Sequence, residues 1–140
     1  MNDTDSGAGA VDPIKELVAR LIREHRQFPP QVKVLNDDLD NPGNLGALTE
    51  HFMHIKDTLT EHMLTEEFEF YPELVRRDLF DENVSAIMQQ HHDVTAALSK
   101  MELTLRLKNM REFKAALDDL ERVLDIHHPA EEDKVFPLVA

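Results

Sequence analysis

The chain has 140 residues, a length that fits one domain, and 41% of them are hydrophobic, which is enough to build a core. It has no cysteine, which excludes disulfides, thiolate metal sites, iron–sulfur clusters and cysteine nucleophiles. The formal net charge of −13 argues against binding to nucleic acid or to an anionic membrane surface. Histidine occurs eight times, whereas about three would be expected from average usage.

Residues 1–11 are mostly small and polar, and we expect a disordered tail there, followed by one domain over residues 12–140. The start of the chain has neither the basic segment nor the apolar segment of a secretory signal. No stretch approaches the ~18 consecutive apolar residues of a membrane span. We therefore expect a soluble, cytoplasmic protein.

Helix signals dominate the rest of the chain, and no segment shows the alternation of a strand. Asp12 and Pro13 form a typical helix start, an N-cap followed by proline at the first helical position. Clusters of helix-breaking residues then separate four long segments. The expected helical segments are residues 12–39, 44–77, 82–107 and 110–138.

Apolar residues recur in each segment at steps of three and four, which forms a heptad seam. Ile14, Val18 and Leu21 begin the first seam, and Leu117 and Leu120 belong to the fourth. Helices with such seams pack at about 20° to one another. Since the connections are short, the pattern predicts an all-α, antiparallel up-down-up-down four-helix bundle.

Prolines interrupt two of the seams. Pro29 and Pro30 fall within the first segment and Pro129 within the fourth. Proline inside a helix removes a backbone hydrogen bond and costs about 3 kcal/mol. We expect a kink or break at both places, with the alternative that the first helix ends near Phe28.

Four seam positions carry histidine instead of an apolar residue, one in each segment: His25, His62, His91 and His127. Counted from the turns at one end of the bundle, they lie about 14 to 17 residues along their helices, so at ~1.5 Å per residue their heights differ by about 5 Å. Any one of them could be a core side chain bonded to a backbone carbonyl. Four histidines from four helices in one layer instead indicate a shared site.

Glu66 and Glu131 join this layer, because each follows a seam histidine by four residues on the same helix face. Two buried carboxylates repel each other unless a cation lies between them. Imidazole and carboxylate without sulfur suit iron, manganese or zinc. Six ligands exceed what a structural zinc uses, so two iron ions fit best, and manganese or zinc is less favoured. The alternative is a layer of salt bridges and hydrogen bonds without metal.

Both histidine–glutamate pairs lie in an internal repeat, H-x3-E-E-x3-aromatic-P, at residues 62–72 and 127–137, whose aromatic–proline pair we expect to close the bundle beyond the site. Together with Glu24-His25 and the single seam histidine of the third segment, the doubled block resembles the hemerythrin-like proteins, the HHE cation-binding domain family, from about residue 12 to 140. The resemblance implies a four-helix bundle with a non-haem, oxo- or hydroxo-bridged di-iron centre. It also implies terminal histidine ligands and bridging glutamates. The metal ligands would be His25, His62, Glu66, His91, His127 and Glu131.

The chain departs from the oxygen-carrying members of this family at two positions. Thr95 stands where they have a second histidine on the third helix, and Glu131 follows its histidine by four residues, where they have an aspartate after five. A seventh ligand could be Glu69, one turn further along the second seam, or His92; otherwise water or hydroxide fills the position. We expect the other neighbouring residues to be exposed or to support the ligands from outside. These are Glu67, Glu132, His51, His54, His92 and His128.

Three functions remain open at this point. The site could bind or sense dioxygen, nitric oxide or iron itself. It could be a di-iron redox enzyme acting on peroxide or nitric oxide, because the missing third-helix histidine leaves metal positions open. The bundle could also hold zinc, or no metal, and serve partner binding. The E-x-x-H motif of ferritin-like proteins, HExxH and glycine-rich phosphate loops are absent from the sequence. For a di-iron site of the kind that the resemblance implies, the expected partner is a small diatomic ligand or peroxide.

Overall fold

The computed structural model describes residues 12–41 and 43–140, and the tail predicted for residues 1–11 lies outside the described residues. The described residues form helices and turns without any strand, which confirms the all-α prediction. The helical elements are α1 (Pro13–His25), α2 (Phe28–Leu39), α3 (Leu45–Thr65), the π-helical turn η1 (Glu66–Phe70), α4 (Tyr71–Arg76), α5 (Glu82–Arg106), α6 (Met110–Ala130), the π-helical turn η2 (Glu131–Val135) and the 3-10 turn η3 (Phe136–Val139).

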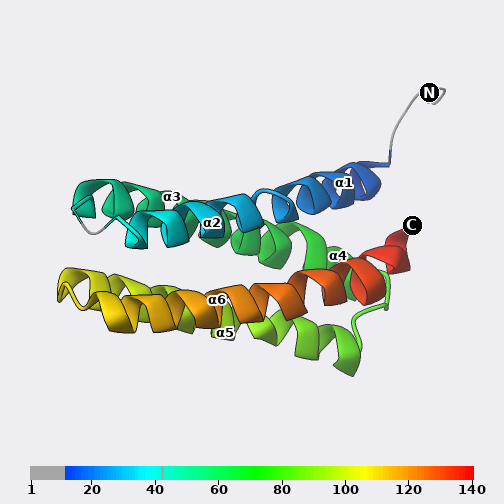
Figure 1. The fold of residues 1–140 in the computed structure, drawn as a ribbon. Helices are drawn as coiled ribbons and strands as arrows, with labels where there is room; N and C mark the ends of the chain where they lie inside the picture. The colour runs from blue at the N-terminus through cyan, green and yellow to red at the C-terminus, as the bar shows by residue number, and fades with distance from the viewer. Residues whose placement is uncertain (1–11, 42) are drawn as a thin grey trace.

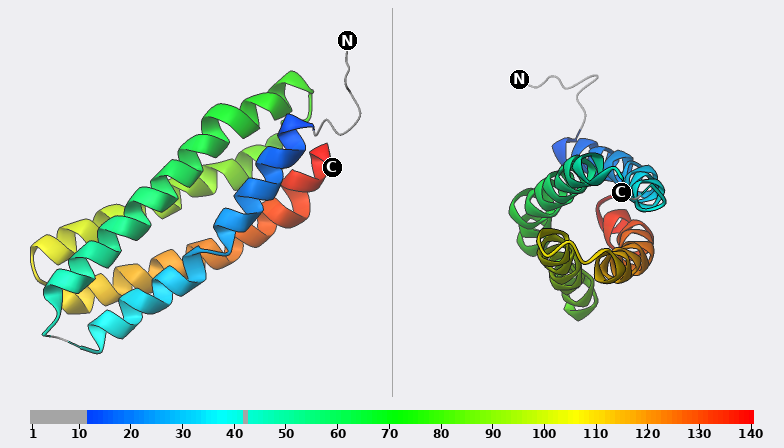
Figure 2. Two further views of the ribbon diagram at one scale, coloured as in Figure 1. Left: turned by 90° about the horizontal axis from the view of Figure 1, so that it is seen from above. Right: turned by 60° about the vertical axis from the view of Figure 1, so that its left-hand side comes forward.

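These elements join end to end into four rods that follow the four predicted segments closely (Figure 1). α1 and α2 form the first rod, α3 to α4 the second, α5 the third, and α6 to η3 the fourth. Successive rods run in opposite directions around a common axis (Figure 2). α2 packs on α3, α5 on α6, α2 on α6 and α3 on α5. The predicted up-down-up-down bundle is therefore confirmed.

Among the described residues, none of the helices combines the length with the apolar character that a bilayer crossing requires.

The first rod is interrupted directly after His25. α1 ends at that residue and α2 begins at Phe28, with Pro29 and Pro30 in its first turn. Proline is tolerated there because the first amides of a helix have no intrahelical partner. The predicted break is therefore confirmed, a few residues before the prolines themselves.

Of the kink or break predicted at Pro129, the break is wrong, because α6 continues through this residue to Ala130, and the kink stays a prediction. A single proline removes one backbone hydrogen bond. Here His128 directly before the proline and Glu131 two residues after it are buried, so packing against the other rods holds this stretch of backbone in place.

Two π-helical turns, η1 and η2, shift the register of the second and fourth rods. In η1 the amide of Tyr71 bonds to the carbonyl of Glu66, five residues back, and the same pattern recurs in η2. Such a turn accommodates one extra residue, so the residues after it are rotated by about one position around the helix. In a regular α-helix Glu69 would continue the seam and face the core. Because of the extra residue, Glu69 is exposed and Phe70 is buried in its place.

The core consists of two apolar clusters separated by a polar layer. The cluster toward the α2–α3 and α5–α6 connections contains Phe52 and Phe113, whose ring centroids are 5.9 Å apart. The cluster toward the opposite end contains Phe70 and Phe136, 5.1 Å apart. The buried histidines and glutamates lie between these clusters, where the apolar packing on both sides keeps water away.

Candidate metal centre

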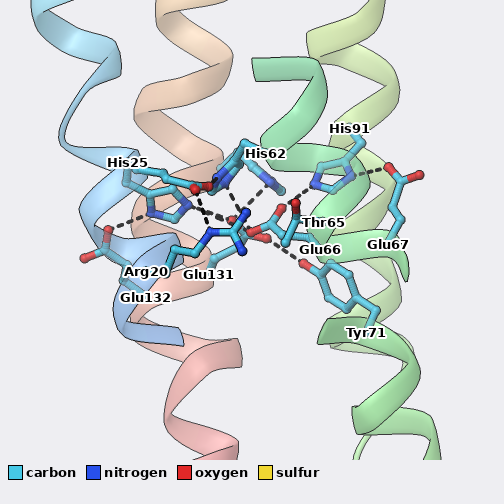
Figure 3. Close-up of polar contacts among 12 residues, drawn as sticks. Arg20, His25, His62, Thr65, Glu66, Glu67, Tyr71, His91, Glu131 and Glu132 are labelled. Atoms are coloured by element: carbon cyan, nitrogen blue, oxygen red, sulfur yellow. Dashed lines mark hydrogen bonds and ion pairs between the residues drawn. The ribbon is translucent and has the colours of Figure 1, made fainter. Parts of the chain in front are cut away.

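The structure brings the six predicted ligand residues into this polar layer, with each rod contributing at least one of them (Figure 3). All six are buried, and the two glutamates have no exposed surface. The ring centroids of the first two histidines are 4.8 Å apart, and those of the last two are 4.9 Å apart. The six residues are His25, His62, Glu66, His91, His127 and Glu131.

Glu66 contacts histidines from three rods. Its Oε1 lies 2.9 Å from Nε2 of His91, and its Oε2 lies 3.3 Å from Nε2 of His62. The same Oε2 is 4.0 Å from Nε2 of His25. This carboxylate thus links the two pairs of histidines.

Glu131 links the pairs in the same way from the opposite side. Its Oε1 is 3.2 Å from Nε2 of His25 and 3.4 Å from Nε2 of His127, and its Oε2 accepts a hydrogen bond from the Tyr71 hydroxyl at 2.7 Å. It belongs to both groups of residues whose ligand atoms lie within 4.8 Å of one another. These groups are His25, His62, His128 and Glu131, and Glu66, His91, His127 and Glu131.

The outward-facing Nδ1 atom of each histidine contacts a side-chain oxygen. An oxygen at Nδ1 favours the tautomer with its hydrogen there, so the Nε2 lone pair of a neutral imidazole faces the centre. Histidine ligands of metals show this arrangement almost always. The four contacts are His25–Glu132 at 2.8 Å, His62–Glu24 at 2.7 Å, His91–Glu67 at 2.6 Å and His127–Gln90 at 2.8 Å.

These outer contacts follow the internal repeat. Glu24 precedes the histidine of the first rod and contacts the histidine of the second rod, His62. In the same way Gln90 precedes the histidine of the third rod and contacts that of the fourth rod, His127. Glu67 follows the glutamate of the second rod and contacts His91 of the third rod. Glu132 follows the glutamate of the fourth rod and contacts His25 of the first rod. The two halves of the bundle therefore build the same arrangement twice.

Five buried atoms of the layer have no hydrogen-bond partner among the described residues. Buried polar atoms without a partner are rare and cost about 1–3 kcal/mol each. Here they come from imidazoles and carboxylates whose ligand atoms form two close groups that share Glu131. This donor set fits a metal cation bound between the rods. The five atoms are Nε2 of His25, His62 and His127, Oε2 of Glu66 and Oε1 of Glu131.

Without a metal, protons balance the buried carboxylates. Burial by itself lowers the pKa of His62, but its contacts with glutamates, Glu66 above all, outweigh burial and raise that pKa to about 9. The pKa of His91 is also raised, because the same carboxylate overcomes the effect of burial. Burial raises the pKa of Glu131, yet contacts with histidines such as His127 hold it well below its usual range. A cation entering the layer therefore displaces protons.

Tyr71, expected only to close the bundle beyond the site, belongs to the site itself. Its hydroxyl donates to Glu131, and the ring is buried. Burial, followed by the nearby carboxylates, raises the pKa of the phenol, so the group remains protonated. The repeat contained a signal for it, because Tyr71 occupies the position of Phe136 and differs by this hydroxyl.

His128 is the second residue with an unexpected place. It is buried, and its ring stacks on that of His25 with centroids 3.8 Å apart. Of the two expectations for His128, an exposed position is therefore wrong. The other expectation, that it supports a ligand from outside the layer, agrees with its contact with His25. The first rod packs against α6 and covers this side chain, which the heptad pattern of one helix does not specify.

The other neighbouring residues divide as follows. Glu69 and His92, the two options for a seventh ligand, are both exposed, so neither lies in the layer. For Glu69 the reason is the extra residue accommodated by η1. Glu67 and Glu132 contact ligand histidines, as expected. His51 and His54 are exposed, also as expected.

Residues 82–140 match a family model, that of the hemerythrin HHE cation binding domain. The resemblance inferred from the repeated motif is confirmed over these residues, which include His91, His127 and Glu131. The remaining predicted ligands lie before the matched part and reach the same layer through the fold. Comparisons with curated proteins and with solved structures found no match.

Proposed function

From the match to the hemerythrin HHE cation binding domain and the geometry of the layer, we propose that this chain is a non-haem di-iron protein of the hemerythrin-like kind. Its role in this proposal is to bind or sense dioxygen, nitric oxide or iron itself. When bound, two iron ions supply the redox chemistry and the open coordination positions that such small molecules require.

The observation that carries the proposal is the pair of four-residue groups that share Glu131. Two ions, one near His25 and His62 and the other near His91 and His127, would use the inward Nε2 atoms of all four histidines. Glu66 and Glu131 face both pairs of histidines, which supports a bridging role for them. The ligand atoms fall into two groups that share Glu131, and this division favours two ions over one.

The chain's own residues then orient and isolate the centre. The outer carboxylates and Gln90 hold the imidazole rings in place through their Nδ1 atoms. Tyr71 donates to Glu131 and so holds one oxygen of this carboxylate. The apolar clusters on both sides of the layer limit the access of water.

Metal analysis with an optical spectrum tests the proposal. After expression in iron-rich medium we expect about two irons per chain and the near-ultraviolet absorption of an oxo-bridged pair. His91→Ala should lower the metal content, while His92→Ala, at the exposed neighbouring position, should not. Zinc alone, no metal, or loss of metal only in the His92 variant would contradict the assignment.

A di-iron redox enzyme acting on peroxide or nitric oxide is the second candidate. Two observations favour it: the position four residues after His91 carries the exposed Thr95 in place of a second histidine, and the phenol of Tyr71 donates a hydrogen bond to Glu131 beside the layer. Turnover of peroxide or nitric oxide by the iron-loaded chain, lowered in Tyr71→Phe, would support this function. Reversible binding of dioxygen by the reduced chain, without turnover, would support a carrier or sensor instead.

A further inference from the structure

A cavity of about 320 Å³ lies beside the break in the first rod, and His25 forms part of its wall. On the side of α2 the wall is apolar, with Phe28, Pro29 and Val32. On the side of the fourth rod polar side chains form a polar wall, interrupted by Leu124 and Pro129, and one of them, His128, has a ring nitrogen close to ligand atoms of the candidate centre.

Four residues of the polar wall follow one another at spacings of four, three and four, so they lie in a row along one face of the fourth rod. The outer two are exposed carboxylates, the third is a buried imidazole, and the fourth is a carboxylate 2.8 Å from Nδ1 of His25. Carboxylate and imidazole are ligands for divalent cations. We call this row the acidic row; it consists of Glu121, Asp125, His128 and Glu132.

His128 provides an independent sign of a ligand. The residue is 8% exposed, its side chain borders the cavity, and its ring has no hydrogen bond among the described residues. One of its ring nitrogens lies within 4.8 Å of the ligand atoms of His25, His62 and Glu131. Its ring is inclined by only 14° to that of His25 on which it stacks. Although both histidines belong to the first group, two rings stacked face to face direct their lone pairs side by side and not toward one point, so we assign His25 as the resident ligand and His128 to an ion in transit.

The internal repeat supplies a comparison within the same molecule. A cavity of about 200 Å³ on the other half of the bundle is lined by the residues 65 positions before the acidic row. There Lys56 replaces the first carboxylate and forms an ion pair with Glu102. Threonine and methionine replace the next two groups. The counterparts are Lys56, Thr60, Met63 and Glu67. The acidic row is therefore a property of one half of the molecule and does not follow from the fold.

We propose that the acidic row is the path by which a divalent cation such as Fe²⁺ reaches the metal centre. In the cavity wall carboxylates outnumber the single guanidinium, that of Arg26, by four to one, so the mouth attracts cations. His128 receives the ion from the outer carboxylates and passes it to the layer beside His25. The path rests on the proposed function, since it requires a centre that binds metal.

The rate of metal uptake tests the path. Metal-free full-length chain is mixed with Co²⁺ at low ionic strength, and the absorption of the bound ion is followed by stopped flow. The double variant Glu121→Gln, Asp125→Asn should take up Co²⁺ roughly twofold to tenfold more slowly, with the same final amount bound. Asp118→Asn, Asp119→Asn removes the same charge from α6 outside the cavity wall and should leave the rate unchanged. Equal rates in the two double variants would overturn the path.

His128→Phe tests the inner step, because phenylalanine keeps a ring against His25 and removes both nitrogens. Uptake should slow while the final metal content stays at the wild-type value, and His92→Phe, at an exposed position, should change neither. An unchanged rate, or a lower final content that marks His128 as a permanent ligand, would overturn its role in transit. A wild-type chain that binds no cation would refute the proposed function and the path together. Normal binding with a rate insensitive to the acidic row would refute the path alone.

Discussion

Each histidine of the layer is oriented through one nitrogen and presents the other to the centre. His91 shows both contacts clearly, with Nδ1 2.6 Å from Glu67 and Nε2 2.9 Å from Glu66. The outer contact restricts the tautomer and the rotation of the ring, and so reduces the entropy that a metal-bound imidazole loses. A side chain outside the layer can therefore influence the affinity for metal.

Glu67→Ala should lower the affinity for metal by about 10- to 100-fold, because His91 loses the partner of its outer nitrogen. Competition with a chelator of known affinity measures this change. Glu69→Ala is the matched control, since it removes the same type of side chain from the same turn at an exposed position away from the layer. Equal affinities in the two variants would show that the outer contact does not support the ligand.

The stability of the metal-free chain should depend on pH through His62, whose pKa rises from 6.5 to about 9 in the folded state against the effect of burial. A raised pKa means that the folded chain holds this proton more tightly than the unfolded chain does. The contribution to stability is therefore complete below pH 6.5 and is lost as the pH rises through about 9.

Denaturant unfolding of the metal-free chain at several pH values should show the free energy of unfolding decreasing over this range. In the metal-loaded chain a cation replaces the protons, so the decrease should be smaller. A metal-free profile that is flat between pH 6.5 and 9 would contradict the contribution of His62.

At the level of elements, the two π-helical turns determine which residues close the bundle beyond the layer. Each turn begins at the glutamate of the layer and is followed by the aromatic–proline pair of the repeat. The extra residue rotates Phe70 and Tyr71 into the core while Glu66 keeps its place in the layer. A regular helix would bury Glu69 instead, at a considerable desolvation cost.

Insertion of one alanine directly after Glu69 adds a second extra residue to this turn and should rotate Phe70 and Tyr71 away from their buried sites. We expect a loss of at least about 3 kcal/mol in the free energy of unfolding, comparable to the truncation of a buried phenylalanine. Glu69→Ala, which removes the side chain but keeps the residue count, should cost far less. Tyr71 is the single tyrosine and the chain has no tryptophan, so its fluorescence reports the change directly. Equal stability of the insertion and the substitution would contradict this account of η1.

At the scale of the whole molecule, the polar layer is the place where all four rods meet. It separates two apolar clusters, and its unpartnered atoms make the metal-free bundle less stable than an apolar layer would. A cation that links residues from all four rods binds the folded chain far better than the unfolded chain. Metal binding is thus coupled to the stability of the entire bundle.

Removal of the metal should therefore lower the thermal stability of the chain. At a free metal concentration of 1,000 times the dissociation constant the stabilisation amounts to about 4 kcal/mol. Thermal unfolding with and without a chelator measures the difference. His127→Ala should reduce it strongly, whereas His54→Ala, at an exposed position, should preserve it. A chelator effect of the same size in both variants would place the stabilising ion elsewhere.

Helix boundaries and the six residues of the layer could be predicted because they depend on local chemistry and regular spacing. Asp12 accepts a hydrogen bond from the Ile14 amide at 3.0 Å, as the N-cap pattern indicated. The seam positions identified the inward residues before each π-helical turn, and equal helix heights placed them in one layer. The resemblance to a known family depended on the same repeated residues, and the family match covers the second half of them.

The sequence by itself thus determined the all-α class, the four rods and the six residues that converge, because backbone capping and heptad periodicity act within one helix. Only the tertiary structure decided that His128 is buried, that Tyr71 donates to Glu131, and that Glu69 faces solvent. These outcomes depend on contacts between rods far apart in the chain and on a π-helical turn that shifts the register by one residue. No spacing within a single helix encodes such contacts, so they appear only when the four rods are packed together.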